Sequence, residues 1–300
     1  FSIISCDNLP SNGKVLRGLL IEFAKLRNAE LADWIEDRVT CPSSMVDRIV
    51  PATTETDRQN VQKQLGLEDQ GVVVTEGFSQ WVLEDNFCAG RPAWEEVGVT
   101  MVDDVTPFEH MKLRMLNGTH STLAYLGFIA GHEFVADAAN DSDFQQLLLE
   151  MWQDEIIPTL SMPVGIDLES YAHDLMARYQ NPELHHRLYQ IAMDGSQKLP
   201  QRLLGTLRDH LTANRLPKRV LLAIAGWMRY VTGIQENGNG YEVQDPLTPK
   251  LRQLAQESGF LNGQLNSKKT SEYVHQLLQI EEIFGSDLSN NTIFSQQLTS

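Results

Sequence analysis

The spacing of apolar residues changes near residue 105, and this change constrains the fold more than any other feature of the 300-residue sequence. Before it, short runs rich in β-branched residues alternate with stretches of helical periodicity. After it, apolar residues recur almost throughout at the 3.6-residue spacing of amphipathic helices. The sequence therefore predicts an α/β region over 1–105, followed by a mostly α-helical domain over 106–300.

The same pattern predicts the individual elements. In the first region it indicates strands at 1–6, 45–50, 72–75, 78–83 and 98–102, and helices at 14–26 and 30–38. In the second it indicates helices at 107–115, 121–130, 143–156, 168–179, 197–211, 218–231, 250–257 and 271–284. Because Phe1 already stands inside an apolar run, we expect the chain to be part of a longer protein.

Charge and cysteine content narrow the class of protein. There are 24 Lys and Arg against 40 Asp and Glu, a formal net charge of −16. A field of that sign repels phosphate backbones and anionic lipids, so we expect neither nucleic acid nor membrane as a partner. An anionic substrate would need a locally basic pocket. Cys6, Cys41 and Cys88 are too few for a disulfide framework, which predicts a reduced, cytoplasmic protein with Cys6 and Cys88 buried.

The motifs of several common sites are absent from the sequence. It contains no H-E-x-x-H, no G-x-G-x-x-G, no P-loop and no G-x-S-x-G nucleophile elbow. Neither cysteines nor carboxylates cluster at the spacing of metal ligands. We therefore expect no protein-bound catalytic metal, and these motifs by themselves complete no cofactor site.

Polar residues gather on one side of the predicted helix over 109–120. With Lys112 as the origin and about 100° per residue, Glu109 lies about 60° around the helix axis. His120 and Asn117 lie at about 80° and about 140°. A solvated face is one interpretation, but a lysine among a glutamate, an asparagine and a histidine is also an acid–base set. Gly118 costs a helix about 1 kcal/mol relative to alanine, which suggests a bend or a close approach there.

These residues resemble a known active-site signature. Lys112-x4-Asn117-x2-His120 is similar to the signature of the mannitol dehydrogenase family, the polyol-specific long-chain dehydrogenases. Four further segments resemble family motifs in the same order, from residue 2 to at least 240. They are S-C-D-N-x-x-x-N-G at 5–13, S-M-V-D-R-I at 44–49, E-D-x-F with G-R-P at 84–92, and D-G-S-x-K-x-P at 194–200.

The resemblance implies a fold and an activity. The expected activity is metal-independent and NAD- or NADP-dependent, and interconverts a polyol or aldonate secondary alcohol with a ketose or keto-acid, of the mannitol/fructose or mannonate/fructuronate type. The expected fold is a Rossmann-type remnant without its glycine loop, followed by a domain similar to the C-terminal domain of 6-phosphogluconate dehydrogenase. The expected partner is a small sugar, polyol or sugar acid, and the protein is expected to be a monomer or homodimer.

The resemblance also assigns catalytic roles, residue by residue. Lys112 is implied to be the general acid/base, which requires a lysine tuned by its surroundings. Asn8 and Asn117 are implied to hydrogen-bond the reacting oxygen. His120 is implied to contact a substrate hydroxyl, and Glu109 to relay protons near the lysine.

Further positions match the binding pocket. Asp47 and Lys198 match substrate contacts, and Val46, with Asn8, lies where the nicotinamide is expected. Each has a structural alternative: a turn cap for Asn8, an ion pair with Arg48 for Asp47, and a helix-end charge for Lys198.

One departure from the family pattern concerns substrate binding. An arginine is expected shortly before Ile191, but Gln190 stands there and Arg187 lies one turn earlier. A keto-acid would need a cation for its carboxylate, which Lys198 or Arg187 could supply. The alternative to an enzyme is a non-catalytic helical binding or interaction module that cannot bind cofactor alone, and these 300 residues could be inactive by themselves.

Overall fold

The computed structural model of the chain describes residues 1–235, 238–259 and 267–299. Residues 236–237, 260–266 and 300 of the predicted helical domain lie outside this description. The chain divides into two compact units. Unit 1 comprises Phe1–Lys112 and Ser161–Ile166, and unit 2 comprises Leu113–Leu160 and Asp167–Ser300.

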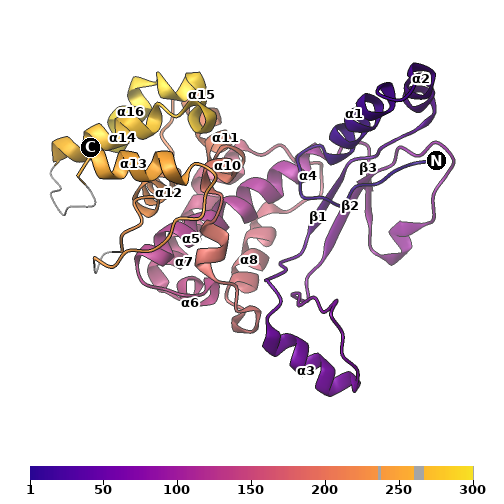
Figure 1. Cartoon of the computed structure of the whole chain (residues 1–300), viewed down its shortest axis with the longest axis horizontal. Coiled ribbons are helices and arrows are strands. Elements are labelled where there is room, and N and C mark those ends of the chain that lie inside the picture. Colours follow the sequence, from indigo (N-terminus) through magenta and orange to yellow (C-terminus); the bar gives the residue numbers. More distant parts are fainter. Residues whose placement is uncertain (236–237, 260–266, 300) are drawn as a thin grey trace. The chain divides into compact units, whose positions relative to one another are not determined.

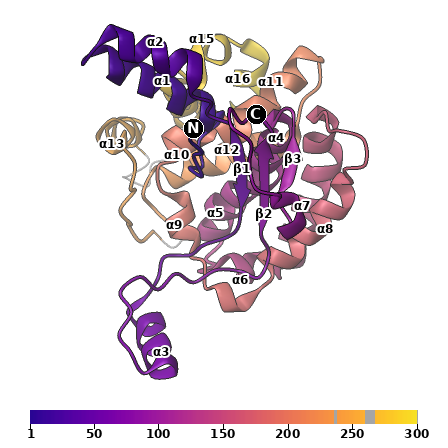
Figure 2. The same ribbon diagram turned by 90° about the vertical axis from the view of Figure 1, so that its right-hand side faces the viewer.

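Unit 1 contains a three-stranded sheet in the order β1-β2-β3 (Figure 2). Strand β1 (Ser44–Asp47) runs antiparallel to β2 (Gln80–Glu84), which runs parallel to β3 (Thr100–Val102). Val82 and Leu83 of β2 are fully buried, as expected for a central strand. Three of the five predicted strands are therefore confirmed.

The other two predicted strands are wrong. In the segment 1–6, Ser2 forms only an isolated parallel bridge with Thr40, and the segment is exposed or half-buried. The segment 72–75 has no strand, and the carbonyl of Val72 instead accepts a hydrogen bond from Thr53 Oγ1 at 2.8 Å. Apolar and β-branched residues favour an extended backbone, but they form a strand only where a neighbouring strand pairs with them.

The predicted helices of unit 1 are confirmed with small shifts at their ends. Helix α1 (Asn12–Lys25) packs against α2 (Ala29–Arg38) through the apolar residues Ile21, Ala24, Ala32 and Ile35. Asn28 caps α2 by accepting a hydrogen bond from the Glu30 amide at 2.8 Å. A short 3-10 helix, η1 (Trp94–Val97), and helix α4 (Thr106–Met111) complete the unit.

Helix α3 (Glu55–Leu65) is absent from the sequence-based prediction. It lies between β1 and β2 in the chain and stands apart from the sheet at the end of two extended segments (Figure 1). None of its residues is buried, so no apolar stripe marks it in the sequence. The available signal is the capping box, in which Thr54 and Asp57 exchange side-chain and backbone hydrogen bonds.

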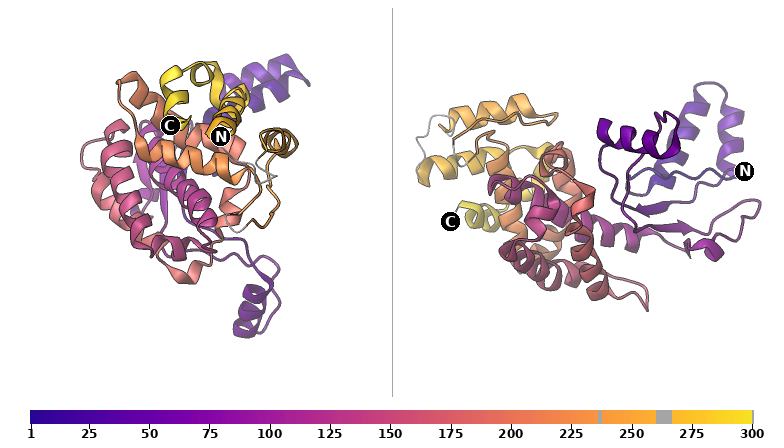
Figure 3. Two further views of the ribbon diagram at one scale, coloured as in Figure 1. Left: turned by 90° about the vertical axis from the view of Figure 1, so that its left-hand side faces the viewer. Right: turned by 90° about the horizontal axis from the view of Figure 1, so that it is seen from below.

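The named elements of unit 2 are all helices, and two isolated β-bridges, Phe134–Arg187 and Ile234–Gly240, join loops among its described residues. Helix α5 packs against α9 and α12, and α16 packs against α12 and α14 (Figure 1, Figure 3). The α-helices are α5 (Thr119–Ile129), α6 (Val135–Ala139), α7 (Ser142–Glu150), α8 (Leu168–Tyr179), α9 (Leu188–Ala192), α10 (Gly195–Leu199), α11 (Gly205–Thr212), α12 (Lys218–Tyr230), α13 (Thr248–Glu257), α14 (Ser267–Leu278), α15 (Glu281–Ser289) and α16 (Thr292–Thr299). Two 3-10 helices, η4 (Ile157–Thr159) and η5 (Pro182–Leu184), join them.

Most predicted helices of unit 2 are confirmed, but one is divided. The predicted helix over 271–284 is two helices, since α14 ends at Leu278 and α15 begins at Glu281. Inside α15, Gly285 has a positive φ of 69°, which bends the chain where most residues would be strained. The short α6 and α9 and the C-terminal α16 are absent from the prediction.

The prediction of a uniform 3.6-residue helical period is also wrong at three segments, which are π-helical. These are η2 (Lys112–Gly118), η3 (Met151–Ile156) and η6 (Pro200–Leu204). A π-helix bonds residue i to i+5, so the angles predicted around the axis from Lys112 do not hold. Side chains support the altered backbone of η2, because Trp152 Nε1 donates to the Met115 carbonyl and Tyr179 Oη to the Leu116 carbonyl, at 3.0 and 2.7 Å.

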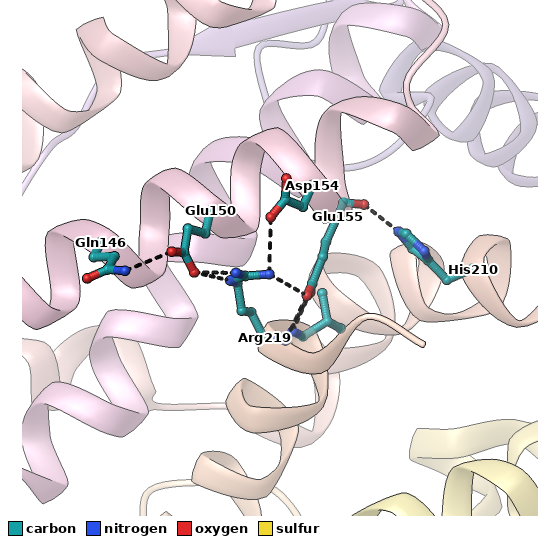
Figure 4. A network of polar contacts seen from close by, with 7 residues as sticks. Gln146, Glu150, Asp154, Glu155, His210 and Arg219 are labelled. Carbon is teal, nitrogen blue, oxygen red and sulfur yellow. Dashed lines mark hydrogen bonds and ion pairs between the residues drawn. The ribbon is translucent and has the colours of Figure 1, made fainter. Parts of the chain in front are cut away.

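The buried carboxylate of Glu155 caps the N-terminal end of α12 (Figure 4). Glu155 of η3 accepts hydrogen bonds from the amides of Arg219 and Val220, both at 2.9 Å, and these amides have no partner inside the helix. The Arg219 guanidinium contacts Glu155 and Glu150, and His210 Nε2 lies 2.6 Å from the Glu155 carbonyl. This network ties α7 and η3 to α11 and α12.

The cysteines depart from the expectation in one respect. All three are free, but Cys6 and Cys88 are exposed and only Cys41 is buried. No helix within the described ranges has the length and apolar character needed to span a membrane.

Candidate active site

Lys112 is the centre of the polar site in unit 1. It lies at the end of α4, where the π-helical segment η2 begins, and its side chain is buried. Its Nζ donates to Asn8 Oδ1 at 2.6 Å and to the Val46 carbonyl at 2.7 Å. Three residues that the resemblance places at the reacting centre and at the nicotinamide are therefore in direct contact.

Asn12 explains why these residues meet. Its buried amide donates to the carbonyls of Asp7 and Ser44, both at 2.9 Å, and accepts from the Ser44 amide at 2.9 Å. It thus joins the loop that carries Asn8 to the start of the strand that carries Val46. Asn12 is absent from the predicted site residues, although it is the second asparagine of the S-C-D-N-x-x-x-N-G segment.

Glu109 lies on α4, three residues before the lysine. Its carboxylate is buried and accepts the Ser11 amide through both oxygens, at 2.9 and 3.1 Å. Burial raises the pKa of this carboxyl above its usual range, the Ser11 amide opposes the rise, and the charge of Glu84 adds to it. A carboxyl of this kind exchanges its proton closer to neutrality than an exposed glutamate does. Asp47 is also buried, at the end of β1.

In unit 2, Asn117 and His120 occupy η2 and the first turn of α5, and both are buried. The His120 ring stacks on Tyr179, with centroids 5.1 Å apart, and meets the edge of the His186 ring at 5.0 Å. Among the described residues, Asn117 Oδ1, His120 Nε2 and His186 Nδ1 have no hydrogen-bond partner. Buried polar atoms without partners are costly, so they mark positions where a ligand would supply the missing bonds.

Both imidazoles are held neutral. Burial lowers the pKa of His120 well below its usual value, and neighbouring positive groups such as Arg202 add to the effect. Burial, and then the charge of Lys198, lowers the pKa of His186 to about 4. A neutral imidazole can donate one hydrogen bond and accept another, which suits contacts with sugar hydroxyls.

Two cations, Lys198 and Arg202, lie near these imidazoles, and the four residues are called the cluster below. Lys198 of α10 donates from Nζ to the Ile191 carbonyl at 3.2 Å, and Arg202 of η6 donates from Nη1 to Ser121 Oγ at 2.9 Å. Burial, and then the charge of Arg202, lowers the pKa of Lys198 to about 8. Arg202 and His186 are absent from the residues that the sequence predicts. For Arg202 the available signal is its position one helical turn after Lys198.

Two glycines allow the helices of the cluster to approach. A Cβ on Gly118 would lie 2.8 Å from the Arg202 carbonyl oxygen, so the close approach expected at Gly118 is confirmed. A Cβ on Gly195 would lie 2.4 Å from Trp227 Nε1. The glycine of the Asp-Gly-Ser segment therefore allows the helix that carries Lys198 to pack closely against Trp227.

Arg187 has a different environment. Its guanidinium pairs with Glu133 and lies over the Phe134 ring, 5.0 Å from the centroid, and 59% of its side chain is exposed. Of the two cations that the sequence offers for a carboxylate, Lys198 neighbours the two buried histidines and Arg187 has its own anionic partner. No three His, Cys, Asp or Glu side chains gather as metal ligands in the part of the chain that the structure describes.

Two family models match the chain. The model of the mannitol dehydrogenase Rossmann domain matches residues 1–96, and that of the mannitol dehydrogenase C-terminal domain matches residues 104–300. The architecture is therefore a Rossmann-like domain followed by a helical C-terminal domain. That the first is only a remnant stays a prediction.

Individual relatives agree with the family models. D-mannonate oxidoreductase of Escherichia coli is 45% identical over 300 residues, which are 100% of this chain and 60% of that protein. Mannitol 2-dehydrogenase of Emericella nidulans is 35% identical over 302 residues, 100% of this chain and 58% of that protein. The solved ternary complex of Pseudomonas fluorescens mannitol 2-dehydrogenase with NAD and D-mannitol has a TM-score of 0.84 at 39% identity, and covers 100% of this chain and 58% of that one.

The chain thus spans about three-fifths of the length of these relatives, between 58% and 60%. The matched models, the identities and the order of the motifs lead to one conclusion: the chain belongs to the mannitol dehydrogenase family.

Proposed function

We propose that this chain carries the catalytic residues of an NAD- or NADP-dependent oxidoreductase that interconverts a polyol or aldonate secondary alcohol with the corresponding ketose or keto-acid. The observation that carries the proposal is the direct contact of Lys112 Nζ with Asn8 and with the Val46 carbonyl. The names of the relatives support this reaction class, and the complex of the Pseudomonas fluorescens enzyme favours NAD. Residues 1–105 would serve the cofactor and residues 106–300 the substrate, in the cytoplasm.

The residues near Lys112 fit a nicotinamide site. Asn8 is exposed, so its amide is open to a ligand while it touches the lysine, and Val46 is half-buried beside it. These two residues would hold the nicotinamide. The cofactor, when bound, would supply or accept the hydride.

Residues of the protein would transfer the proton that accompanies the hydride. In reduction, Lys112 would donate a proton from Nζ to the carbonyl oxygen that becomes the alcohol, and in oxidation it would take that proton back. Asn8 would donate a hydrogen bond to the same oxygen and stabilise the charge that develops on it, a role that the family resemblance also gives to Asn117. Glu109, whose pKa is raised by burial, would pass protons between the lysine and solvent.

The substrate side would use the remaining predicted residues. His120 would bond a hydroxyl through its unpartnered Nε2, and Asp47 and Lys198 would contact further oxygens. Arg187 would contribute only if it left Glu133. The reaction is proposed to need no metal, because a lysine proton donor and amide donors can polarise a carbonyl by themselves.

The test uses the protein expressed from its natural gene. Oxidation of NADH and NADPH is followed with fructose, fructuronate and tagaturonate, with and without a chelator. Lys112→Ala is expected to lower kcat about 10²- to 10⁴-fold, the usual contribution of general acid–base catalysis. The matched control is Lys63→Ala on the exposed helix α3, which should keep wild-type turnover.

Normal turnover by Lys112→Ala would remove the lysine from its role. Loss of turnover with the chelator would contradict metal independence. If the protein neither binds NADH, followed by its fluorescence, nor turns over any substrate, the non-catalytic helical module is the correct interpretation.

A further inference from the structure

Lys198 and Arg202 differ from three cations of unit 2 that form ion pairs within the described ranges. Arg114 pairs with Asp209, Arg208 with Asp287, and Arg219 with Glu150. Within the described ranges neither Lys198 nor Arg202 forms an ion pair, and their hydrogen-bond partners are a neutral carbonyl and a neutral hydroxyl. Removing a cation from water without an anion is unfavourable, so two such groups one helical turn apart suit an anion supplied from outside the chain.

The two imidazoles beside these cations are neutral, and the carboxylates whose charges act on Lys198, those of Asp194 and Asp245, form no ion pair with it in the described ranges. His120 and His186 stay uncharged near pH 7 because burial depresses the pKa of each. Neither they nor Asn117 cancels the positive charge, and each has one buried atom without a partner among the described residues. The cluster therefore combines atoms suited to hydroxyl groups with two cations suited to a negative group.

Ser121 orients the side chain of Arg202. Arg202 Nη1 donates to Ser121 Oγ at 2.9 Å, and Ser121 directly follows His120. The close contact between Gly118 and the Arg202 backbone fixes the start of the arginine side chain against the same helix. Both ends of this side chain are therefore positioned relative to His120.

We propose that the substrate carries a carboxylate, that Arg202 and Lys198 bind it, and that Arg202 determines the preference for a sugar acid over a neutral sugar. This inference rests on the proposed function and specifies its substrate class. The planar guanidinium matches a planar carboxylate through parallel hydrogen bonds, which an ammonium alone does not offer. In a chain of net charge −16, such a local pair of cations would favour an anionic substrate.

The first experiment compares substrates and variants in the protein from its natural gene. KM and kcat are measured for fructuronate, fructose and fructose 6-phosphate with wild type, Arg202→Gln and the control Arg215→Gln, which removes an exposed arginine of the same unit. Wild type should favour fructuronate over both others. Arg202→Gln should raise KM for fructuronate about ten- to hundredfold, the range for a lost charge-assisted hydrogen bond, and leave KM for fructose unchanged. Arg202→Lys should recover part of the loss.

A second variant and a binding measurement keep the result interpretable. Ser121→Ala removes the acceptor that orients Arg202, and should raise KM for fructuronate without changing that for fructose. Calorimetric binding of D-mannonate and D-mannitol needs no turnover. If D-mannonate binds more tightly in an Arg202-dependent way but no hydride is transferred, the proposed function fails and carboxylate recognition stands.

Three results would overturn the inference. The first is a preference of the wild type for fructose, and the second is a preference for the phosphate ester. The third is an equal rise of KM for fructose and fructuronate in folded Arg202→Gln and Ser121→Ala, which would give Arg202 a structural role only.

Discussion

Neighbouring residues of the motif at 5–13 have different roles in this chain. In the segment 5–13, Asn8 is exposed and touches the catalytic candidate Lys112, whereas Asn12 is buried and holds two chain segments together. Gly13 serves a third purpose. Its Cβ position lies 2.3 Å from the Cys41 carbonyl oxygen, which leaves no room for any side chain. The motif therefore combines one chemical residue with two that place it.

A pair of glycines on α1 tests this placement. Gly13→Ala forces a Cβ against backbone atoms of the segment 41–43, and should lower the free energy of unfolding by about 1–3 kcal/mol, as overpacking usually does. Gly18→Ala in the same helix meets no atom within 4 Å, and should raise it by about 0.5–1 kcal/mol through helix propensity. Urea denaturation of both variants measures the two changes. Equal effects of the same sign would show that the close approach at Gly13 is unimportant.

At the level of elements, the π-helical segments carry much of the site. Lys112 and Asn117 lie in η2, and Arg202 lies in η6. Segment η6 begins at Pro200, which has no amide hydrogen for the regular helical pattern. The altered backbone is maintained by partners outside its own helix, as Trp152 shows for η2. Such segments are frequent at functional sites, because they redirect side chains within a continuous helix.

The carboxylate of Glu155, which caps the N-terminal end of α12, leads to a prediction about stability. Glu155→Ala leaves the Arg219 and Val220 amides without their acceptor, and should lower the free energy of unfolding by about 3–5 kcal/mol. Glu150→Ala removes a more exposed partner of the same arginine, and should cost under about 1 kcal/mol. Chemical denaturation followed by circular dichroism compares them. If both variants lose the same stability, the capping role of Glu155 is wrong.

At the scale of the whole molecule, charge is distributed unevenly. The chain is strongly acidic, yet Lys198 and Arg202 stand close to two neutral histidines without a carboxylate paired to either cation in the described ranges. Net charge argues against nucleic acid as a general partner, but it does not argue against a small anion. The local arrangement of cations decides that question.

The buried histidines make stability depend on pH. The pKa of His186 is about 4 in the folded chain, against about 6.5 when unfolded. Because the folded value is the lower one, the unfolded chain binds more protons between these values. The contribution of His186 to stability is complete above about pH 6.5 and is lost as the pH falls towards 4. His120 acts in the same direction, whereas the raised pKa of Glu109 gives stability that is lost as the pH rises.

His186→Gln should therefore reduce the loss of stability on acidification, by up to about 1.4 kcal/mol per pH unit within that window. Urea unfolding at pH 7.5, 6 and 5 measures the slope for wild type and variant. The exposed His275→Gln is the matched control and should keep the wild-type slope. A parallel pH dependence of His186→Gln and wild type would contradict the burial of this histidine.

Much of the secondary structure can be predicted from the sequence, because hydrophobic periodicity is local. The change near residue 105, helices such as α8 and α12, and strands β1 to β3 all follow from it. The errors have identifiable causes. The segments 1–6 and 72–75 lack pairing neighbours, and α3 has no buried face to give it an apolar stripe.

For the site, the sequence by itself determined the family motifs and the contact candidates Lys112, Asn8 and Val46, because these depend on residue type and order. Only the tertiary structure revealed the tie made by Asn12, the π-helical backbone, and the cluster in which Arg202 and His186 join His120 and Lys198. The physical reason is that burial, an unpaired charge and an unpartnered polar atom are properties of packed surroundings. Those surroundings are assembled here from segments 117–121, 179–186 and 198–202, which are far apart in the chain.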